Sequence, residues 1–364
     1  MSTQITAWIL SFLSFFAFWN PNAQPNNIPE TRTYVGEAPD QYGAWPAEDF
    51  ETGCVSPLAP AALEAWYFLS SLPGTTTESL LIMHKGKLVY ERYADDWDRD
   101  TPHYMASVTK SVVSALVGIA IGEGKIGGVG DKVVDYFPEA KKLPGWQESK
   151  ADMTIEHLLT MTSGILAESD EEWDGFFAED QKDSALYGFL LPQKTAPGAK
   201  YAYDNIAPSI LLGIVERATG QKLLKYAQKK LFKPLGMTSV GWDTAADGLP
   251  FGGFGISMPP RDMLRFGYLY LNNGRWEDKQ IIPADYVAVT PPRSKAREAY
   301  GYMFWNYKPL PFDKSYKASG AYGQEIVMLP EWDIVIARTA DANWLDRTWN
   351  DFQGKLDELG LKFW

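Results

Sequence analysis

The chain has 364 residues, 45% of them hydrophobic and 22% charged, which is ordinary for a globular protein with a large core. It holds 34 Lys and Arg against 46 Asp and Glu, and this net charge of −12 disfavours nucleic acid and anionic membranes as partners. A single cysteine, Cys54, excludes an intrachain disulfide. One cysteine and three scattered histidines cannot readily supply a structural zinc site.

The amino terminus carries an apolar segment, AWILSFLSFFAFW at residues 7–19, followed by a stretch rich in Pro and Asn. The segment is too short to span a bilayer comfortably and has the length of a secretory signal core. No Lys or Arg precedes Arg32, and the PNA tripeptide at 21–23 is a poor cleavage site, so a buried segment or an uncleaved anchor is the alternative. We expect residues 1–28 to direct export to the periplasm or the medium, with a cytoplasmic location as the alternative. Any membrane contact would go through this segment.

After residue 28, the sequence predicts strands first, then mostly helices, and finally strands and a last helix. Residues 29–74 form a polar strap and a helix at Pro60–Leu72. A β-hairpin is predicted around Gly86, from Ser79–Lys85 and Lys87–Tyr93. Apolar spacing predicts further helices at Val108–Ile121, Thr154–Met161, Ile206–Ala218, Lys222–Leu231, Pro260–Leu271, Pro283–Thr290 and Asn343–Leu359, and strands at Tyr302–Trp305, Glu325–Leu329 and Asp333–Arg338. This order indicates an α/β body from both chain ends, about 75–105 and 255–364, with a helical lobe of about 106–254 inserted.

The first candidate site element is Ser107-Val-Thr-Lys110, at the start of a helix whose small residues on several faces predict burial all round. Positions i and i+3 share a helix face, so the lysine can reach the serine hydroxyl. A serine becomes a nucleophile when a base takes its proton, and a buried lysine with a depressed pKa can be that base. Taken alone, the pattern also fits a serine N-cap followed by a solvated lysine.

Two further elements lie downstream. Tyr203-Asp204-Asn205 precedes a helix, so Tyr203 can relay a proton and Asn205 can hold a substrate carbonyl, orient Lys110 or simply cap the helix. Ser319-Gly320-Ala321 lies just before a strand, where glycine lets the backbone run close to a substrate and an N–H can stabilise an oxyanion.

In order and spacing, SVTK at 107–110, YDN at 203–205 and SGAYGQ at 319–324 resemble the three boxes of the penicillin-recognising serine hydrolases. The resemblance is to class C β-lactamases, D-alanyl-D-alanine carboxypeptidases, family VIII esterases and 6-aminohexanoate-oligomer hydrolases, and it covers about residues 75–345. It implies an α+β fold of the β-lactamase/transpeptidase type: an antiparallel sheet flanked by helices, with an inserted all-α lobe. It also implies Ser107 as the acylated nucleophile and Lys110 with Tyr203 as the acid/base pair, assisted by Asn205. The N–H groups of Ser107 and Ala321 would form the oxyanion hole.

The third box departs from the β-lactamase and peptidase pattern at one position. Those enzymes usually carry Lys or His two residues before the glycine, where Ala318 stands here, and Lys317 is one residue out of step, on the other face of a strand. The segment Glu168–Asp183 holds eight acids around Trp173, Phe176 and Phe177. It is either a solvated acidic loop or a lid whose aromatic residues, Trp173 among them, contact the substrate and whose charges repel anions.

We therefore expect a serine hydrolase that cleaves small ester or amide substrates through a Ser107 acyl-enzyme, without a metal or cofactor. A β-lactamase or peptidoglycan carboxypeptidase is the first alternative, and a catalytically inactive binding protein on the same scaffold is the second.

Overall fold

The computed structural model describes residues 32–34, 75–94, 97–165, 170–178, 182–290, 299–306 and 314–342. The expected export segment and the helices expected at Pro60–Leu72 and Asn343–Leu359 lie outside these residues. Within the described part, no helix combines the length and apolarity needed to cross a membrane.

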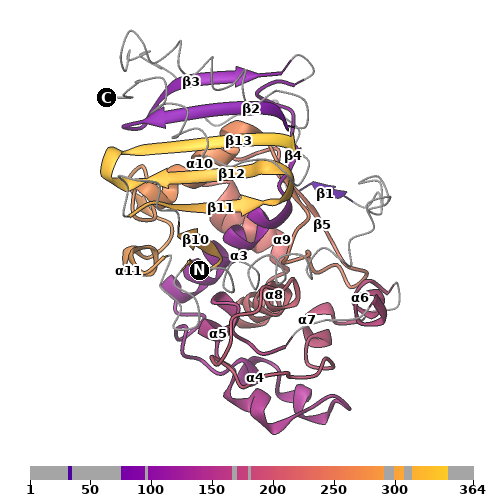
Figure 1. Ribbon diagram of the computed structural model, residues 1–364. Helices are drawn as coiled ribbons and strands as arrows, with labels where there is room; N and C mark the ends of the chain where they lie inside the picture. The colour runs from indigo at the N-terminus through magenta and orange to yellow at the C-terminus, as the bar shows by residue number, and fades with distance from the viewer. Residues whose placement is uncertain are drawn as a thin grey trace, which may run out of the picture.

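The body of the protein is a seven-stranded antiparallel sheet in the order β3-β2-β13-β12-β11-β10-β9 (Figure 1). Its strands are β2 (Thr75–His84), β3 (Lys87–Tyr93), β9 (Tyr300–Gly301), β10 (Phe304–Asn306), β11 (Tyr316–Gly320), β12 (Gln324–Leu329) and β13 (Ile334–Ala342). The predicted hairpin is confirmed: Lys85 and Gly86 both have positive φ, as a two-residue type I′ turn requires. Strand β2, from the start of the domain, pairs with β13 from its end, so both ends complete one sheet.

Helix α10 (Pro260–Leu271) packs on this sheet against β2, β12 and β13, as Figure 1 also shows. A Cβ atom at Gly267 would lie 2.5 Å from Val335 Cγ1 and 2.7 Å from Ile326 Cγ2, so the missing side chain lets helix and sheet approach closely. All six residues of β12 are buried, which means that both faces of the sheet are covered at its centre. The resulting core holds β11 and β12 in a fixed position.

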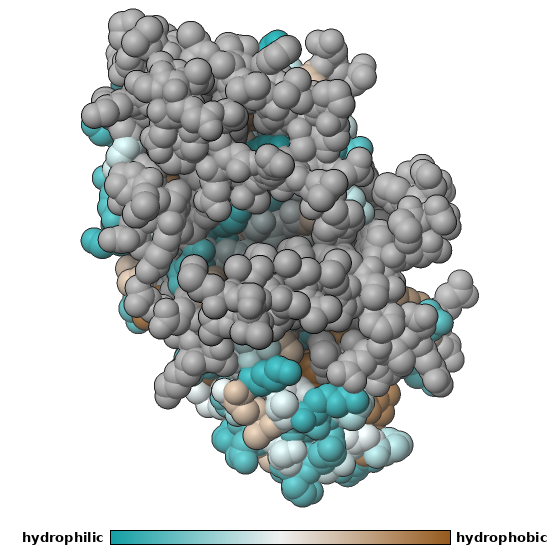
Figure 2. Space-filling model, in the orientation of Figure 1, coloured by the Kyte–Doolittle hydropathy of each residue, from teal (hydrophilic) through white to brown (hydrophobic). Residues whose placement is uncertain are grey.

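The helical lobe lies at one end of the sheet (Figure 1), and hydrophilic residues predominate on its far end in Figure 2. Its helices are α3 (Thr109–Gly122), α4 (Val133–Tyr136), α5 (Ile155–Leu159), α6 (Asp170–Phe177), α7 (Ser184–Tyr187), α8 (Ile206–Thr219) and α9 (Leu223–Ala227), with 3₁₀ turns η2 (Ala106–Val108), η3 (Pro138–Lys142) and η4 (Glu148–Asp152). Helix α3 contacts both β11 and α8, so it joins the lobe to the sheet.

The predicted burial of α3 on all sides is confirmed, because 12 of its 14 residues are buried. Its small residues make room for Tyr286 on α11 (Ala284–Ala288): Ser114 Oγ lies 3.0 Å from Tyr286 Oη. A Cβ atom at Gly118 would lie 2.8 Å from the Tyr286 ring. The helix is therefore tightly packed on all sides, which fixes the position of Lys110 in its first turn.

A small second sheet, in the order β1-β5-β6-β4, was not predicted. It consists of β1 (Arg32–Tyr34), β4 (His103–Tyr104), β5 (Gly241–Asp243) and β6 (Ile256–Met258), and a separate hairpin joins β7 (Arg275–Trp276) to β8 (Lys279–Gln280). Strand β5 falls within the range expected for the helical lobe, yet it pairs with β6. The helix predicted at Lys222–Leu231 is α9 continued by a π-helical turn, Gln228–Phe232.

Candidate active site

Ser107 lies on the 3₁₀ turn η2, just before α3 rather than within it. The preceding residue, Ala106, has φ = +45°, a left-handed conformation that costs a non-glycine residue about 1–3 kcal/mol. The turn is held from both sides: Met105 N donates to Ile256 O at 2.8 Å, and Thr109 Oγ1 donates to Ala106 O at 2.7 Å. Such a fixed, strained turn is typical of a residue whose side chain must point in one direction.

Lys110 is 1% exposed and its Nζ atom has three hydrogen-bond partners. It donates to Ser107 Oγ at 3.0 Å, to Asn205 Oδ1 at 2.6 Å and to the carbonyl oxygen of Gly253 at 2.7 Å. Burial lowers the pKa of Lys110 to about 7, and the negative charge of Asp204 offsets part of that shift. The expected pairing of serine and buried lysine is present, and the lowered pKa lets the lysine lose its proton much nearer to neutral pH than a free lysine does.

Tyr203 completes the group around the serine. Its ring centroid lies 4.7 Å from Lys110 Nζ, and its phenol is hydrogen-bonded to the Ser107 side chain. Burial raises the pKa of Tyr203 well above its ordinary value, with a smaller opposing effect from Ser107. The ring stacks on Trp305, with 5.8 Å between centroids, and meets Tyr300 edge-on at the same distance. The phenol is therefore a fixed, protonated group beside Ser107.

Of the three tasks that the sequence left open for Asn205, helix capping falls to Asp204 and the contact with Lys110 falls to Asn205. Asp204 Oδ1 accepts hydrogen bonds from the N–H groups of Ile206 and Ala207, at 2.7 and 2.6 Å, and so caps α8. Asn205 makes no side-chain capping bond, and its Oδ1 accepts instead from Lys110. Because Asp204 caps the helix, Asn205 is free to orient the lysine.

Gly320, at the end of β11, runs directly beside the serine turn. A Cβ atom at Gly320 would lie 3.1 Å from Ser107 N and would collide with the carbonyl oxygen of Met105. The next residue, Ala321, begins the 3₁₀ turn η6 (Ala321–Gly323), which contacts η2. The two N–H groups expected to form an oxyanion hole, those of Ser107 and Ala321, therefore belong to adjoining turns.

This arrangement agrees with the comparison to known proteins: a family model described as Beta-lactamase matches residues 73–344. The chain belongs to the β-lactamase family. It is 30% identical over 192 residues to Esterase EstB of Burkholderia gladioli (45% of this chain, 46% of that protein). It is 26% identical over 227 residues to 6-aminohexanoate-dimer hydrolase of Paenarthrobacter ureafaciens (59% and 57%). Both alignments span about half of the relative.

The fold is shared with a solved structure, a putative 6-aminohexanoate-dimer hydrolase from Bacillus anthracis, at a TM-score of 0.68 and 20% identity over 91% of this chain and 92% of that one. The expected superfamily and the β-lactamase/transpeptidase-like fold are thus confirmed. Membership of the β-lactamase family also makes the chain a serine hydrolase.

Within this family, the third box of the chain presents an apolar side chain at the expected carboxylate-binding position. Ala318 is fully buried and shares a strand face with Gly320, the residue beside the turn that carries Ser107. Lys317 lies on the opposite face and forms an ion pair with Glu325 of β12. The lysine next to the box is therefore held by a carboxylate of its own sheet.

The acidic segment contains α6, which rests on the loop that carries Gly253. Phe177, the last residue of α6, is 46% exposed and meets Phe251 and Phe254 at ring distances of 5.5 and 6.0 Å. Trp173 lies on α6, but its side chain is outside what the structure describes. Among the described side chains, Phe177 is the aromatic group that this helix exposes beside the site.

Sequence reasoning missed the Gly253 carbonyl and the Trp305 ring. The glycine-rich run FGGFG at 251–255 was the available signal for a close backbone approach. His103, which precedes Ser107 by four residues, forms a hydrogen bond with Glu78 through Nδ1 at 2.9 Å and stacks on Trp97. Among the described residues, no group of three or more His, Cys, Asp or Glu side chains is placed to hold a metal ion.

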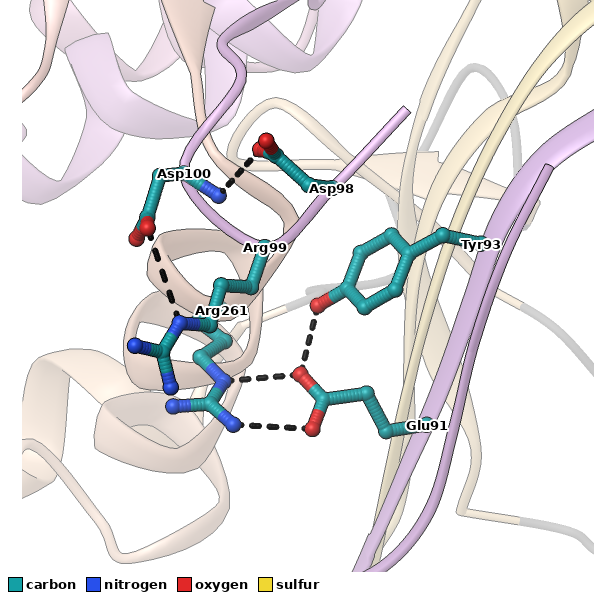
Figure 3. Close-up of a pocket in the computed structure, with 6 residues that line it drawn as sticks. All are labelled: Glu91, Tyr93, Asp98, Arg99, Asp100 and Arg261. Atoms are coloured by element: carbon teal, nitrogen blue, oxygen red, sulfur yellow. Dashed lines mark hydrogen bonds and ion pairs between the residues drawn. The ribbon is translucent and has the colours of Figure 1, made fainter. Parts of the chain in front are cut away.

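A separate hollow of about 500 Å³ lies between β3, the turn at 98–100 and the start of α10 (Figure 3). It is lined by Glu91, Tyr93, Asp98, Arg99, Asp100 and Arg261. Arg261 binds both carboxylate oxygens of Glu91, at 2.7 and 2.8 Å. Burial alone would raise the pKa of Glu91, but the hydrogen bonds from Arg261 and Tyr93 bring it below its ordinary value. Both arginines of this hollow form ion pairs, Arg99 with Asp100 and Arg261 with Glu91, and none of the Ser107 group lines it.

Proposed function

We propose that this serine hydrolase cleaves small neutral esters or amides through an acyl-enzyme on Ser107, with Lys110 as the base. The observation that carries the proposal is the set of three contacts made by Lys110 Nζ. Asn205 Oδ1 and Gly253 O can only accept hydrogen bonds. In a neutral amine they therefore engage both N–H groups, which leaves the lone pair directed at Ser107 Oγ.

Acylation then follows from the positions of these groups. Ser107 Oγ attacks the substrate carbonyl carbon as its proton passes to Lys110 Nζ, and the N–H groups of Ser107 and Ala321 are placed to stabilise the oxyanion. The intermediate collapses when the leaving group takes a proton through Tyr203. Because burial raises the pKa of Tyr203, the phenol serves as a proton relay rather than as the first base. Water then hydrolyses the acyl-enzyme by the reverse sequence.

The substrate class follows from the third box and from α6. Ala318 offers no charge to a carboxylate, and Lys317 is paired with Glu325 on the other strand face. Phe177, with Phe254 beside it, adds an exposed apolar surface near the site. These features favour a neutral substrate with an apolar group over a penicillin or a D-alanyl-D-alanine peptide. The esterase and 6-aminohexanoate-dimer hydrolase relatives support the same choice.

The proposal is tested by intact-mass spectrometry after separate incubation with a fluorophosphonate, an aryl ester and a penicillin. We expect one fluorophosphonate adduct on Ser107, turnover of the ester and no stable penicillin adduct. Ser107→Ala should lose adduct and turnover. The matched control is Ser111→Ala, one helical turn further on, which removes a buried hydroxyl that donates to Met303 O. No adduct in the wild type would favour the inactive binding protein, and rapid penicillin acylation would favour the β-lactamase or peptidase.

A further inference from the structure

A buried carboxylate beside the proposed catalytic group uses only one of its two oxygen atoms to cap a helix. Asp204 is 2% exposed, and its Oδ1 atom accepts the two backbone hydrogen bonds that begin α8. Its Oδ2 atom has no hydrogen-bond partner among the described residues. Helix-capping carboxylates usually lie near water, which hydrates the second oxygen, whereas a buried carboxylate without such a partner is costly.

Lys110 lacks the direct counter-ion that a buried cation normally has. Its three hydrogen-bond partners are a hydroxyl, an amide oxygen and a backbone carbonyl, all uncharged. When it takes the proton from Ser107 it becomes a cation in a site with little water, where an unpaired charge is strongly disfavoured. Asp204 directly precedes Asn205, whose Oδ1 accepts from Lys110 Nζ at 2.6 Å, so its carboxylate lies near that cation and attracts it. Burial raises the pKa of Asp204 to about 6, and the attraction of Lys110 opposes that rise. At low dielectric, such an interaction is only weakly screened.

We propose that Asp204 is a positioning residue whose two oxygens have different tasks. Oδ1 fixes the start of α8 and thereby the adjacent Tyr203 and Asn205, while Oδ2 supplies the buried negative charge that stabilises Lys110 in its protonated form. The inference rests on the proposed role of Lys110 as base. During acylation Lys110 becomes positively charged, and the negative charge of Asp204 stabilises it. A fixed charge near a developing opposite charge lowers the reaction barrier.

Other titratable groups surround the two helices that carry this pair. On elements packed against α8 they are Asp135, Tyr136, Glu156, His157, Tyr187, Lys225 and Tyr226, with Asp183 as the N-cap of α7. On elements packed against α3 they are Lys229, Lys230, Tyr316 and Lys317. Within the described residues, the electrostatic contacts of Asp204 are with Lys110 and Tyr203. Removing the charge at position 204 therefore acts on the catalytic group.

The test compares Asp204→Asn with a matched capping variant, Asp183→Asn. Asparagine caps helices about as well as aspartate, so Asp204→Asn removes the charge and keeps the cap. Asp183 Oδ1 caps α7 by accepting from Leu186 N at 2.8 Å, and Asp183 is outside the catalytic group. The readout is an NMR titration of protein labelled with ¹³C,¹⁵N-lysine, in which Lys110→Met assigns the Lys110 signal.

We expect the Lys110 titration midpoint to fall by about one pH unit in Asp204→Asn and to stay in place in Asp183→Asn, because a neighbouring opposite charge moves a pKa by about 1–3 units. An unchanged midpoint in Asp204→Asn, or an equal shift in both variants, would overturn the proposal. This readout needs no substrate, so it stays interpretable even if ester hydrolysis fails and the proposed function falls.

The rate of fluorophosphonate labelling against pH gives a second readout. In Asp204→Asn we expect the acid limb to move to lower pH and the plateau rate to fall about tenfold, the change that corresponds to one pKa unit. Asp204→Ala should show the same shift of the acid limb as Asp204→Asn. It should also have a lower melting temperature, because alanine removes the helix cap as well as the charge. If Asp204→Asn labels like the wild type while Asp204→Ala does not, the carboxylate is a cap and nothing more, and the proposal is wrong.

Discussion

Replacing Lys110 by methionine should change how the stability of the protein depends on pH. The pKa of Lys110 is about 10.5 ordinarily and about 7 in the fold, so the folded protein binds this proton less tightly than the unfolded chain. The lysine therefore destabilises the fold at low pH, and the penalty shrinks as pH rises from 7 towards 10.5. At 1.36 kcal/mol per pKa unit, the penalty is roughly 5 kcal/mol at pH 6 and roughly 2 kcal/mol at pH 9.

The free energy of unfolding of the wild type, relative to Lys110→Met, should thus rise by about 2–3 kcal/mol from pH 6 to pH 9. Methionine leaves the acceptors of Asn205 and Gly253 without a donor, which lowers the stability of the variant by a similar amount at every pH. The pH dependence of the difference, rather than its size at one pH, is therefore the diagnostic quantity.

Urea denaturation followed by tryptophan fluorescence at four pH values between 6 and 9 measures this difference. Lys132→Met, which removes a lysine that is 44% exposed, corrects for the loss of one positive charge. A difference between wild type and Lys110→Met that stays constant within about 0.5 kcal/mol, the usual scatter of surface substitutions, would refute the reasoning. Lys110 would then titrate like a free lysine and be unsuited to act as base near neutral pH.

Three further predictions concern catalysis. Lys110→Arg should reduce aryl ester turnover at least 100-fold, because arginine keeps the charge but cannot give up a proton. Near-normal turnover in a spectrophotometric assay would mean that another group is the base. Lys317→Ala should leave the ratio of kcat/KM for a neutral ester and a penicillin unchanged, because the ion-paired ammonium of Lys317 lies on the far face of the strand. A loss of kcat/KM for the penicillin alone would contradict that placement. Gly320→Ala should slow fluorophosphonate labelling about 100-fold, because its Cβ would displace the serine turn at Met105, and full labelling would argue against the close approach.

Long elements with a regular pattern were predicted well from the sequence, and short ones held by distant partners were not. Helix α10 and strand β3 have the predicted bounds, because apolar periodicity and local turn signals mark them. Strands β4, β5 and β6 have two or three residues each, too few to show alternation. They exist because residues near positions 103, 241 and 257 pair across the fold, and no local pattern encodes that pairing.

In the candidate site, too, contacts between residues close in sequence were predictable and contacts between distant residues were not. Ser107 and Lys110 are three residues apart, so their contact follows from local geometry and was predictable. Lys110 meets Asn205 across 95 positions and Gly253 across 143, and the second contact involves a backbone carbonyl that any residue type would provide. Sequence analysis assigns no role to Asp204, because only the structure separates the residue that caps α8 from the residue that binds Lys110.

The place of β13 between β2 and β12 matters for how the protein is made. Ser79 on β2 meets Thr339 on β13 through a 2.7 Å hydrogen bond between residues 260 positions apart. At 5–20 residues per second, a ribosome takes roughly 10–50 s to cover that distance. Throughout that time β2 presents an edge to which a chaperone or another chain can bind. Because β13 joins the β2–β3 hairpin to β12, the seven-stranded sheet stays incomplete until β13 has emerged, and we expect hydrolase activity only after that point.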